Sequence, residues 1–254
     1  MRDALFPFLV CSSLFAQDPR QIIEETQQRS RSKSQHYEGT LELHDSKGGV
    51  NTKRWTFDRL GWSGESRSLL RFTAPPELKG VALLIVGHRD GSTDQWIWTP
   101  AVDRERRIAM QDRSTRFFGT DFSFEDLQER DPSQFDYKLL GEDSVDGAVC
   151  WKLESKPKQS QSSQYTSSTL WIRKDDYVIV QIENFNNLSN VKLVRKIRYS
   201  DIVRQNARQN NIWTARNIEV LDAARNSRTV LKIDKLEYNL PMKPEDFTVE
   251  ALRH

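Results

Sequence analysis

The chain has 254 residues, and its 38 basic and 36 acidic residues leave a formal net charge of only +2 at pH 7. Proteins that bind the nucleic-acid backbone present a stripe of positive charge, whereas here the two signs alternate along the whole chain. We therefore expect no nucleic-acid partner, and the length suits either one large domain or two small ones.

The N-terminus has the order of a secretory signal peptide. Arg2 precedes an apolar run over 4–10, and the small residue Ala16 stands just before a polar turn. This order predicts a signal peptide over residues 1–16, cleaved after Ala16, and export to the periplasm. The remaining residues, 17–254, are expected to form one domain. A buried N-terminal helix is the alternative interpretation.

The two cysteines do not predict a disulfide. Cys11 lies within the predicted signal peptide, and the residues before it lack the small side chain that lipidation requires. Only Cys150 remains after cleavage, and its apolar neighbours predict a buried side chain. No further apolar run approaches the roughly 20 residues that cross a bilayer, so the mature chain is expected to be soluble.

Two periodicities divide the rest of the chain. Over 19–35, Ile22 and Ile23 stand among charged and polar residues, which predicts a polar helix with one narrow apolar stripe. From His36 onward apolar residues recur at every second position, the period of a strand with one buried face. Turn residues separate the predicted strands, which number about 11 to 13. They cover residues 36–44, 50–58, 66–73, 81–88, 93–99, 104–110, 136–143, 148–156, 166–173, 177–185, 193–202, 212–222 and 227–238.

So many neighbouring antiparallel strands cannot stay flat. A strongly twisted sheet seldom exceeds about ten strands without closing or splitting. We therefore predict a mainly β domain whose single antiparallel sheet curls into an unclosed half barrel. Two further helices are predicted at 123–129 and 245–252, and with the N-terminal helix they are expected to cover the concave face. Two packed sheets in a sandwich are the alternative.

Large apolar side chains in the strands are candidates for a ligand-binding wall. Trp96 and Trp98 lie two positions apart and share one face of their strand, with Ile97 on the other, and Leu70 and Phe72 share a face in an earlier strand. On the concave side of a curved sheet such side chains would line an apolar pocket. The alternative is that they fill the core of a sandwich.

An acidic group follows the aromatic strands. Asp121, Glu125, Asp126 and Glu129 cluster around the predicted helix at 123–129. Ser123 with Asp126 three residues later resembles a capping box, and carboxylates are favoured in a first helical turn, so a capped helix is the preferred interpretation. A secreted hydrolase that uses Asp121 with Glu125 or Asp126 is the alternative.

No metal or nucleophile pattern is recognisable. His36, His44 and His88 lack the spacing of metal ligands, and no cysteine cluster accompanies them. The segment 61–64 stops short of the pattern of a serine nucleophile elbow. We therefore predict no metal, no cofactor and no catalytic residue.

A basic group lies on one predicted hairpin. Arg104, Arg106 and Arg107, with Arg113 and Arg116 nearby, are denser than the charges around them. Two interpretations remain open. The group is either the solvent-exposed face of a hairpin, or a contact surface for anionic lipid head groups or an acidic partner.

Several segments together resemble the LolA-like outer-membrane lipoprotein-sorting proteins of bacteria. The likeness extends over most of the mature chain, and its middle third is the most distinctive. The segments that carry it are 70–76 (Leu-Arg-Phe-Thr-Ala-Pro-Pro), 80–85, 94–101 (Asp-Gln-Trp-Ile-Trp-Thr-Pro-Ala), 106–108, 118–127 (Phe-Gly-Thr-Asp-Phe-Ser-Phe-Glu-Asp-Leu) and 244–248 (Pro-Glu-Asp-Phe-Thr).

The resemblance implies a monomeric periplasmic carrier and no enzyme. Its unclosed barrel would hold the acyl chains of a lipoprotein, or another lipid, under a helical lid and shuttle them toward the outer membrane. A membrane transport complex is a candidate partner, because the segment 118–127 resembles a branch often linked with export machinery. A periplasmic sensor or regulatory binding module on the same scaffold is the alternative.

The resemblance also implies candidate site residues. In the best-known members a strand arginine bonds to the lid backbone and keeps the empty cavity shut, and Arg54 and Arg71 are the candidates here. The predicted lipid-binding residues are Leu70, Phe72, Trp96, Trp98, Phe118 and Phe122. The predicted contacts to a partner or a head group are Arg104, Arg106 and Arg107.

Overall fold

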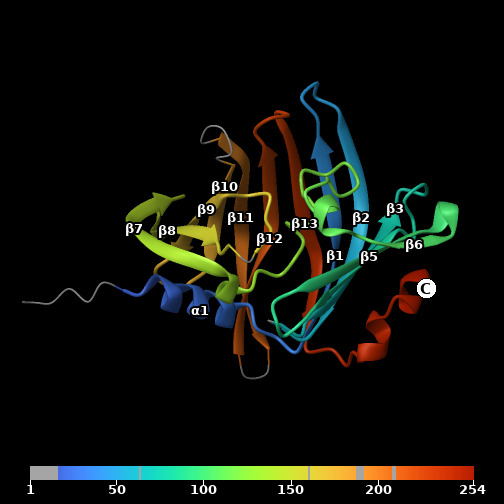
Figure 1. Ribbon diagram of the computed structural model, residues 1–254, viewed down its shortest axis with the longest axis horizontal. Coiled ribbons are helices and arrows are strands. Elements are labelled where there is room, and N and C mark those ends of the chain that lie inside the picture. Colours follow the sequence, from blue (N-terminus) through green and yellow to red (C-terminus); the bar gives the residue numbers. More distant parts are fainter. Residues whose placement is uncertain (1–16, 63, 160, 187–191, 208–209) are drawn as a thin grey trace, which may run out of the picture.

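The computed structural model describes residues 17–62, 64–159, 161–186, 192–207 and 210–254 (Figure 1). The predicted signal peptide, its cleavage after Ala16 and Cys11 lie outside these residues. Within the described ranges, no helix is long and apolar enough to cross a membrane. Cys150 is a buried free thiol, as predicted.

The strands form one antiparallel sheet of 13 strands, in the order β6-β5-β4-β3-β2-β1-β13-β12-β11-β10-β9-β8-β7. Neighbours in the sheet are consecutive in the chain except β1 and β13, which pair across its middle. β6 and β7 form the two edges, so the sheet stays open, as predicted, and the alternative of two packed sheets is wrong. The bounds are β1 Ser34–His44, β2 Val50–Leu60, β3 Arg67–Ala74, β4 Ala82–Gly87, β5 Thr93–Thr99, β6 Arg104–Arg107, β7 Phe135–Val145, β8 Ala148–Pro157, β9 Ser167–Arg173, β10 Ile179–Asn186, β11 Lys192–Ala207, β12 Asn210–Asp222 and β13 Ser227–Tyr238.

Shifts in register bend the sheet. β1 shifts against β13 between Glu38 and Gly39, and β2 shifts against β3 between Arg54 and Trp55. A bulge of this kind bends its strand and increases the local twist. Glycine is needed at the first of these positions, because a Cβ on Gly39 would overlap the carbonyl oxygen of Lys232. The bends curl one face of the sheet inward (Figure 1).

The helices differ from the prediction. α1 spans Pro19–Arg29, shorter than the predicted 19–35, with Asp18 as its N-cap and Ile22 and Ile23 buried. The predicted helix at 123–129 is wrong, because those residues form a series of turns. The predicted C-terminal helix is instead two single 3₁₀ turns, η4 Pro244–Phe247 and η5 Glu250–Arg253. Shorter 3₁₀ turns are η1 Pro100–Val102, η2 Met110–Asp112 and η3 Pro132–Gln134.

The inner face of the sheet carries the main apolar core. Side chains of α1 and of residues 108–131, which we call the inner segment, cover this face. The inner segment contributes Ile108, Phe117, Phe122 and Phe124 to the core. Buried strand residues of the same core are Leu41, Trp55, Leu70, Phe72, Leu83, Ile85, Ile97, Trp151, Leu153, Leu170, Ile172, Ile182, Ile197, Val220 and Ile233.

The outer face carries a smaller core near the edge of the sheet. Ala82, Leu84 and Trp98 pack there against Phe247 and Leu252 of the two C-terminal turns. The sheet therefore has two covers, the inner segment with α1 on one face and the C-terminal turns on the other.

Candidate functional site

Buried polar side chains from several strands hold the inner segment. Lys53 of β2 donates its Nζ to the carbonyl oxygen of Phe118 at 3.0 Å, and Gln95 of β5 donates its Nε2 to that of Phe124 at 2.8 Å. Lys53 is 6 % exposed and Gln95 is fully buried. Burial lowers the pKa of Lys53, and the nearby Arg116 lowers it further. These side chains satisfy carbonyl groups of a segment that has little regular backbone pairing of its own.

Asp121 ties the inner segment to β13. Its carboxylate accepts hydrogen bonds from Thr229 Oγ1 at 2.8 Å and Ser227 Oγ at 2.6 Å, and it pairs with Arg116 at 2.5 Å. The residue is 2 % exposed. All these partners belong to the fold itself, so the contacts of Asp121 match a structural anchor.

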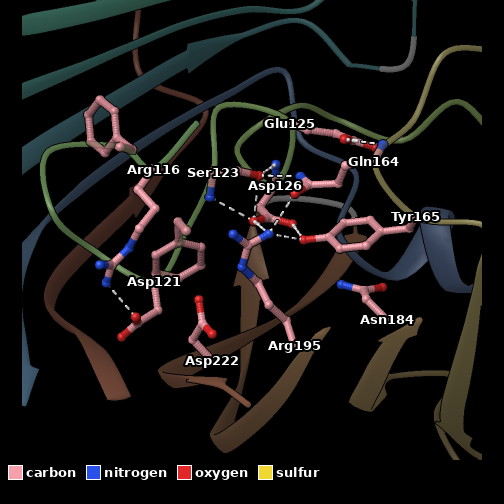
Figure 2. A network of polar contacts seen from close by, with 12 residues as sticks. Arg116, Asp121, Ser123, Glu125, Asp126, Gln164, Tyr165, Asn184, Arg195 and Asp222 are labelled. Carbon is pink, nitrogen blue, oxygen red and sulfur yellow. Dashed lines mark hydrogen bonds and ion pairs between the residues drawn. The ribbon is translucent and has the colours of Figure 1, made fainter. Parts of the chain in front are cut away.

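Asp126 of the inner segment and Arg195 of β11 form a buried ion pair (Figure 2). The closest distance is 3.2 Å, and the two side chains are 4 % and 5 % exposed. Tyr165 donates its hydroxyl to Asp126 Oδ1, and Ser123 donates its backbone N–H to Asp126 Oδ2, each at 2.7 Å. Arg195 also donates to Gln164 Oε1 at 3.0 Å. The pair therefore joins β11, the inner segment and the loop before β9.

The charges of this network stabilise one another. Burial lowers the pKa of Arg195, but Asp126 and Tyr165 outweigh that effect and raise it overall. Burial, reinforced by Asp126, raises the pKa of Tyr165 far above its ordinary value. The phenol thus remains a hydrogen-bond donor near neutral pH. The predicted helix is absent, because residues 124–127 form turns, but the two hydrogen bonds of the predicted capping box are present. The Ser123 N–H donates to Asp126 Oδ2, and the Asp126 N–H donates to Ser123 Oγ at 3.3 Å.

Neither predicted strand arginine reaches the inner segment. Arg54 is exposed. Arg71 donates to the carbonyl oxygens of Leu252 at 2.9 Å and Ala251 at 3.2 Å, so it holds the C-terminal turns. Among the described strand cations that do reach the inner segment, Lys53 and Arg195 are the two buried ones. Lys53 stands two positions before Trp55, and Arg195 stands two positions before Ile197. Both apolar residues are buried on the inner face, and this alternation was the signal in the sequence that could have identified the two cations.

The predicted lipid-binding residues are divided between the two faces. Leu70, Phe72, Phe118 and Phe122 belong to the core of the inner face. The expectation that Trp96 and Trp98 share that face is wrong, because both contribute to the outer core. The register explains why, since Ile97 pairs with Leu83 and Trp96 pairs with Leu84.

The rings of the inner face pack on one another. Phe72 stacks on Phe117 at 5.5 Å between centroids and meets Phe118 edge to face at 5.7 Å. The protein's own aromatic side chains therefore fill the part of the inner face that was predicted to receive a ligand.

The predicted basic surface is largely neutralised. Arg107 pairs with Asp94, and Arg106 pairs with Asp112 at 3.3 Å. Arg104 is exposed and has no ion pair within the described chain. These contacts match the interpretation of a solvent-exposed hairpin face.

A cavity of about 680 Å³ lies between the inner segment and the strands β10 and β11. This volume is within the range of about 300–1,000 Å³ that is typical of small-molecule sites. None of the six predicted lipid-binding residues lines it. Its apolar and aromatic lining is Met110, Phe135, Tyr165, Ile179, Ile182, Ile197 and Tyr199. Its charged lining is His88, Asp90, Asp94, Arg107, Arg113, Glu125, Asp126, Glu129, Arg130 and Asp131.

Three of the four histidines have carboxylate neighbours. His36 contacts Asp58 at 2.7 Å, His44 lies 3.5 Å from Glu42 and His88 lies 3.1 Å from Asp94. Among the residues that the structure describes, no three histidine, cysteine, aspartate or glutamate side chains gather as metal ligands would.

The fold, an open antiparallel sheet, also occurs in solved structures of other proteins. The fold is similar to a domain assigned to the outer-membrane lipoprotein-sorting proteins, from Vibrio parahaemolyticus, with a TM-score of 0.85, 21 % identity and coverage of 93 % of this chain and 98 % of the other. It is similar to a LolA superfamily protein from Nitrosomonas europaea, with a TM-score of 0.70, 19 % identity and coverage of 92 % and 98 %. The predicted resemblance to LolA-like proteins is confirmed.

Another solved structure is more similar in sequence. A DUF1329 family protein from Desulfovibrio piger has a TM-score of 0.85 and 26 % identity, with coverage of 92 % of this chain and 99 % of the other. A family model with the description "Uncharacterized protein" matches residues 64–254, well over half of the chain, so the chain belongs to that family. No curated protein matches the sequence.

Proposed function

We propose that this protein is a periplasmic carrier that binds the acyl chain of a lipoprotein or another lipid and shuttles it toward the outer membrane. The observation that carries the proposal is the cavity of about 680 Å³ with an apolar wall on β10 and β11. The LolA-like fold and the predicted signal peptide support the same interpretation.

The inner segment acts as the lid in this proposal. Its aromatic side chains pack on the inner face, and movement of the segment would uncover that face and extend the cavity. Each buried methylene of an acyl chain contributes about 0.8 kcal/mol. Because the chain would replace ring contacts that the lid already makes, the net affinity is moderate and the cargo can be released to a partner.

The buried polar contacts favour the closed position of the lid. Opening separates Asp126 from Arg195, and a buried charge without its partner is costly. The lid therefore opens as a unit when a bound chain and solvent compensate these charges, and small independent openings are disfavoured.

A cavity-filling variant tests the proposal. Ile197 lies in the cavity wall, and Ile197→Trp is expected to abolish binding of a fluorescent fatty acid and to leave the purified protein free of lipid by mass spectrometry. Val149→Trp, at a side chain that is 55 % exposed and lies outside the cavity lining, is the matched control and should bind normally.

Two results would contradict the carrier. If the wild-type protein is purified without lipid and does not bind the fatty acid, lipid is not its cargo. Crosslinking in cells that recovers a signalling protein and no lipid would favour the regulatory binding module.

A further inference from the structure

Three side chains in the cavity lining have hydrogen-bond donors that no described residue accepts. Arg130 lies with its guanidinium 4.5 Å from the centroid of the Phe135 ring, and its closest polar contact is a long one of 3.4 Å to Ser168 Oγ. It forms no ion pair with any residue that the structure describes. A guanidinium offers five N–H donors, so most of those on Arg130 have no acceptor among the described residues.

Tyr199 and Asn184 add neutral donors to the same cavity lining. Asn184 accepts a hydrogen bond from Ser168 at 2.7 Å through its Oδ1, which leaves its amide NH₂ as a donor. The hydroxyl of Tyr199 makes no hydrogen bond within the described chain. Burial raises the pKa of Tyr199 to about 12, so the hydroxyl keeps its proton at neutral pH.

The carboxylates that line the cavity already have donors. Asp126 binds Arg195, and Asp94 binds Arg107 and His88. The remaining carboxylates accept from other parts of the chain: Glu125 from the backbone of Gln164, Glu129 from Arg59, Asp90 from Ser92 and Asp131 from Ser133. Arg130 is thus a cation without a carboxylate partner, beside two neutral donors and the isoleucines of β10 and β11.

We infer that Arg130, Tyr199 and Asn184 bind an anionic group, a phosphate or a carboxylate, at the head of an amphiphile whose chain lies along Ile179, Ile182 and Ile197. This inference rests on the proposed carrier function and specifies the class of its cargo. Hydrogen bonds between a guanidinium and an oxyanion are among the stronger ones in proteins, and an apolar surrounding strengthens them. Arg130 lies near the C-terminal end of the inner segment, which is the proposed lid, so the anion would also contact the lid.

The test compares amphiphiles that share one saturated chain and differ in the head group. Binding to the full chain is measured by calorimetry for a fatty acid, a lysophosphatidic acid, a neutral monoacylglycerol and an acyl trimethylammonium. The two anionic amphiphiles should bind at least about tenfold more tightly than the neutral one. Inorganic phosphate alone should compete only weakly, because it lacks the chain.

Variants identify the residues. Arg130→Gln should weaken binding of the anionic amphiphiles about tenfold and change binding of the neutral one less than about twofold. Tyr199→Phe removes only a hydroxyl and should give a few-fold loss for the anionic amphiphiles, which keeps the inference testable if Arg130→Gln does not fold. Arg225→Gln, at an exposed arginine outside the cavity lining, is the control and should change neither.

The outcomes separate the inference from the carrier function. Equal binding of anionic and neutral amphiphiles, or tighter binding of the cationic one, overturns the inference and leaves the carrier intact. Competition by inorganic phosphate at concentrations similar to those of the lysophosphatidic acid also overturns it, since the site would then take a free anion. Binding of none of the four amphiphiles contradicts the carrier and the inference together.

Discussion

The two covers of the sheet are built differently. On the outer face, Phe247 and Leu252 pack directly on Trp98 and its neighbours, and Arg71 binds backbone carbonyls of the last turn. On the inner face, the segment 108–131 combines packed aromatic rings with buried polar contacts from four strands, and it borders a cavity. The outer cover rests mainly on close apolar packing, which suits a permanent position. The buried ion pair and the adjoining cavity of the inner segment suit a cover that has one defined closed position from which it can move.

Loss of Arg195 is the change with the largest expected effect on this comparison. Arg195→Met leaves Asp126 buried without its cation, and we expect the free energy of unfolding to fall by about 3 to 5 kcal/mol. Urea unfolding measures the loss. If the inner segment is a lid, the variant should also bind a fluorescent fatty acid faster than the wild type.

The control for this variant removes both charges. The double variant Asp126→Leu with Arg195→Met buries no unpaired charge, so it should regain most of the stability. A single variant as stable as the wild type would show that the ion pair does not hold the inner segment.

Truncation of one buried apolar side chain on each face gives the next largest effect. Phe117 is 2 % exposed and Leu252 is fully buried. Phe117→Ala should cost about 3 to 5 kcal/mol of unfolding free energy and Leu252→Ala about 2 to 5 kcal/mol. Only the first should increase fatty-acid binding, because only Phe117 belongs to the inner segment, which is the proposed lid. An equal change in binding for both variants would argue against a special role of the inner face.

The smallest expected effect is a pH dependence on the outer side of β1. Burial lowers the pKa of His36, but hydrogen bonds to Asp58 and Glu38 outweigh it and raise the pKa above its ordinary value. A raised pKa in the folded state stabilises the fold below the unfolded pKa of about 6.5, and the contribution is lost as pH rises through the folded value. We expect less than about 1 kcal/mol, measured as the change in urea midpoint between pH 5 and pH 8.

The variant His36→Gln removes this titration. Its unfolding free energy should lack the part of the pH dependence that His36 contributes, while fatty-acid binding stays unchanged. A pH dependence identical to that of the wild type would assign the effect to other groups.

The strands were predictable because their signals are local. Alternation and turn residues located every strand within a few residues, although β6 ends at Arg107 and not at 110 as expected. Alternation also established that Trp96 and Trp98 share a face. It does not say which face is enclosed, since that depends on how strands far apart in the sequence curl around the inner segment.

The site was less predictable because its partners are distant in sequence. Ser123 and Asp126 have the spacing of a helix cap, and only the fold brings Arg195 and Tyr165 to the same carboxylate. On β11 the wall residues Ile197 and Tyr199 follow the alternation of any buried strand, so they carry no signal that separates them from the core. On β10 the wall residues Ile179 and Ile182 are three positions apart, and a register shift between Ile179 and Gln181, which the sequence does not announce, accounts for that spacing. Arg195 itself was detectable, as a cation at an inward-facing position.

Hydrogen exchange tests the central claim most directly, because it reports on both covers in one experiment. Mass spectrometry would follow the amides of residues 108–131 and 244–253 with and without a saturating fatty acid. We predict that the ligand changes exchange in the inner segment and leaves the C-terminal turns unaffected. Unchanged exchange in the inner segment, or a change confined to the C-terminal turns, would contradict the account.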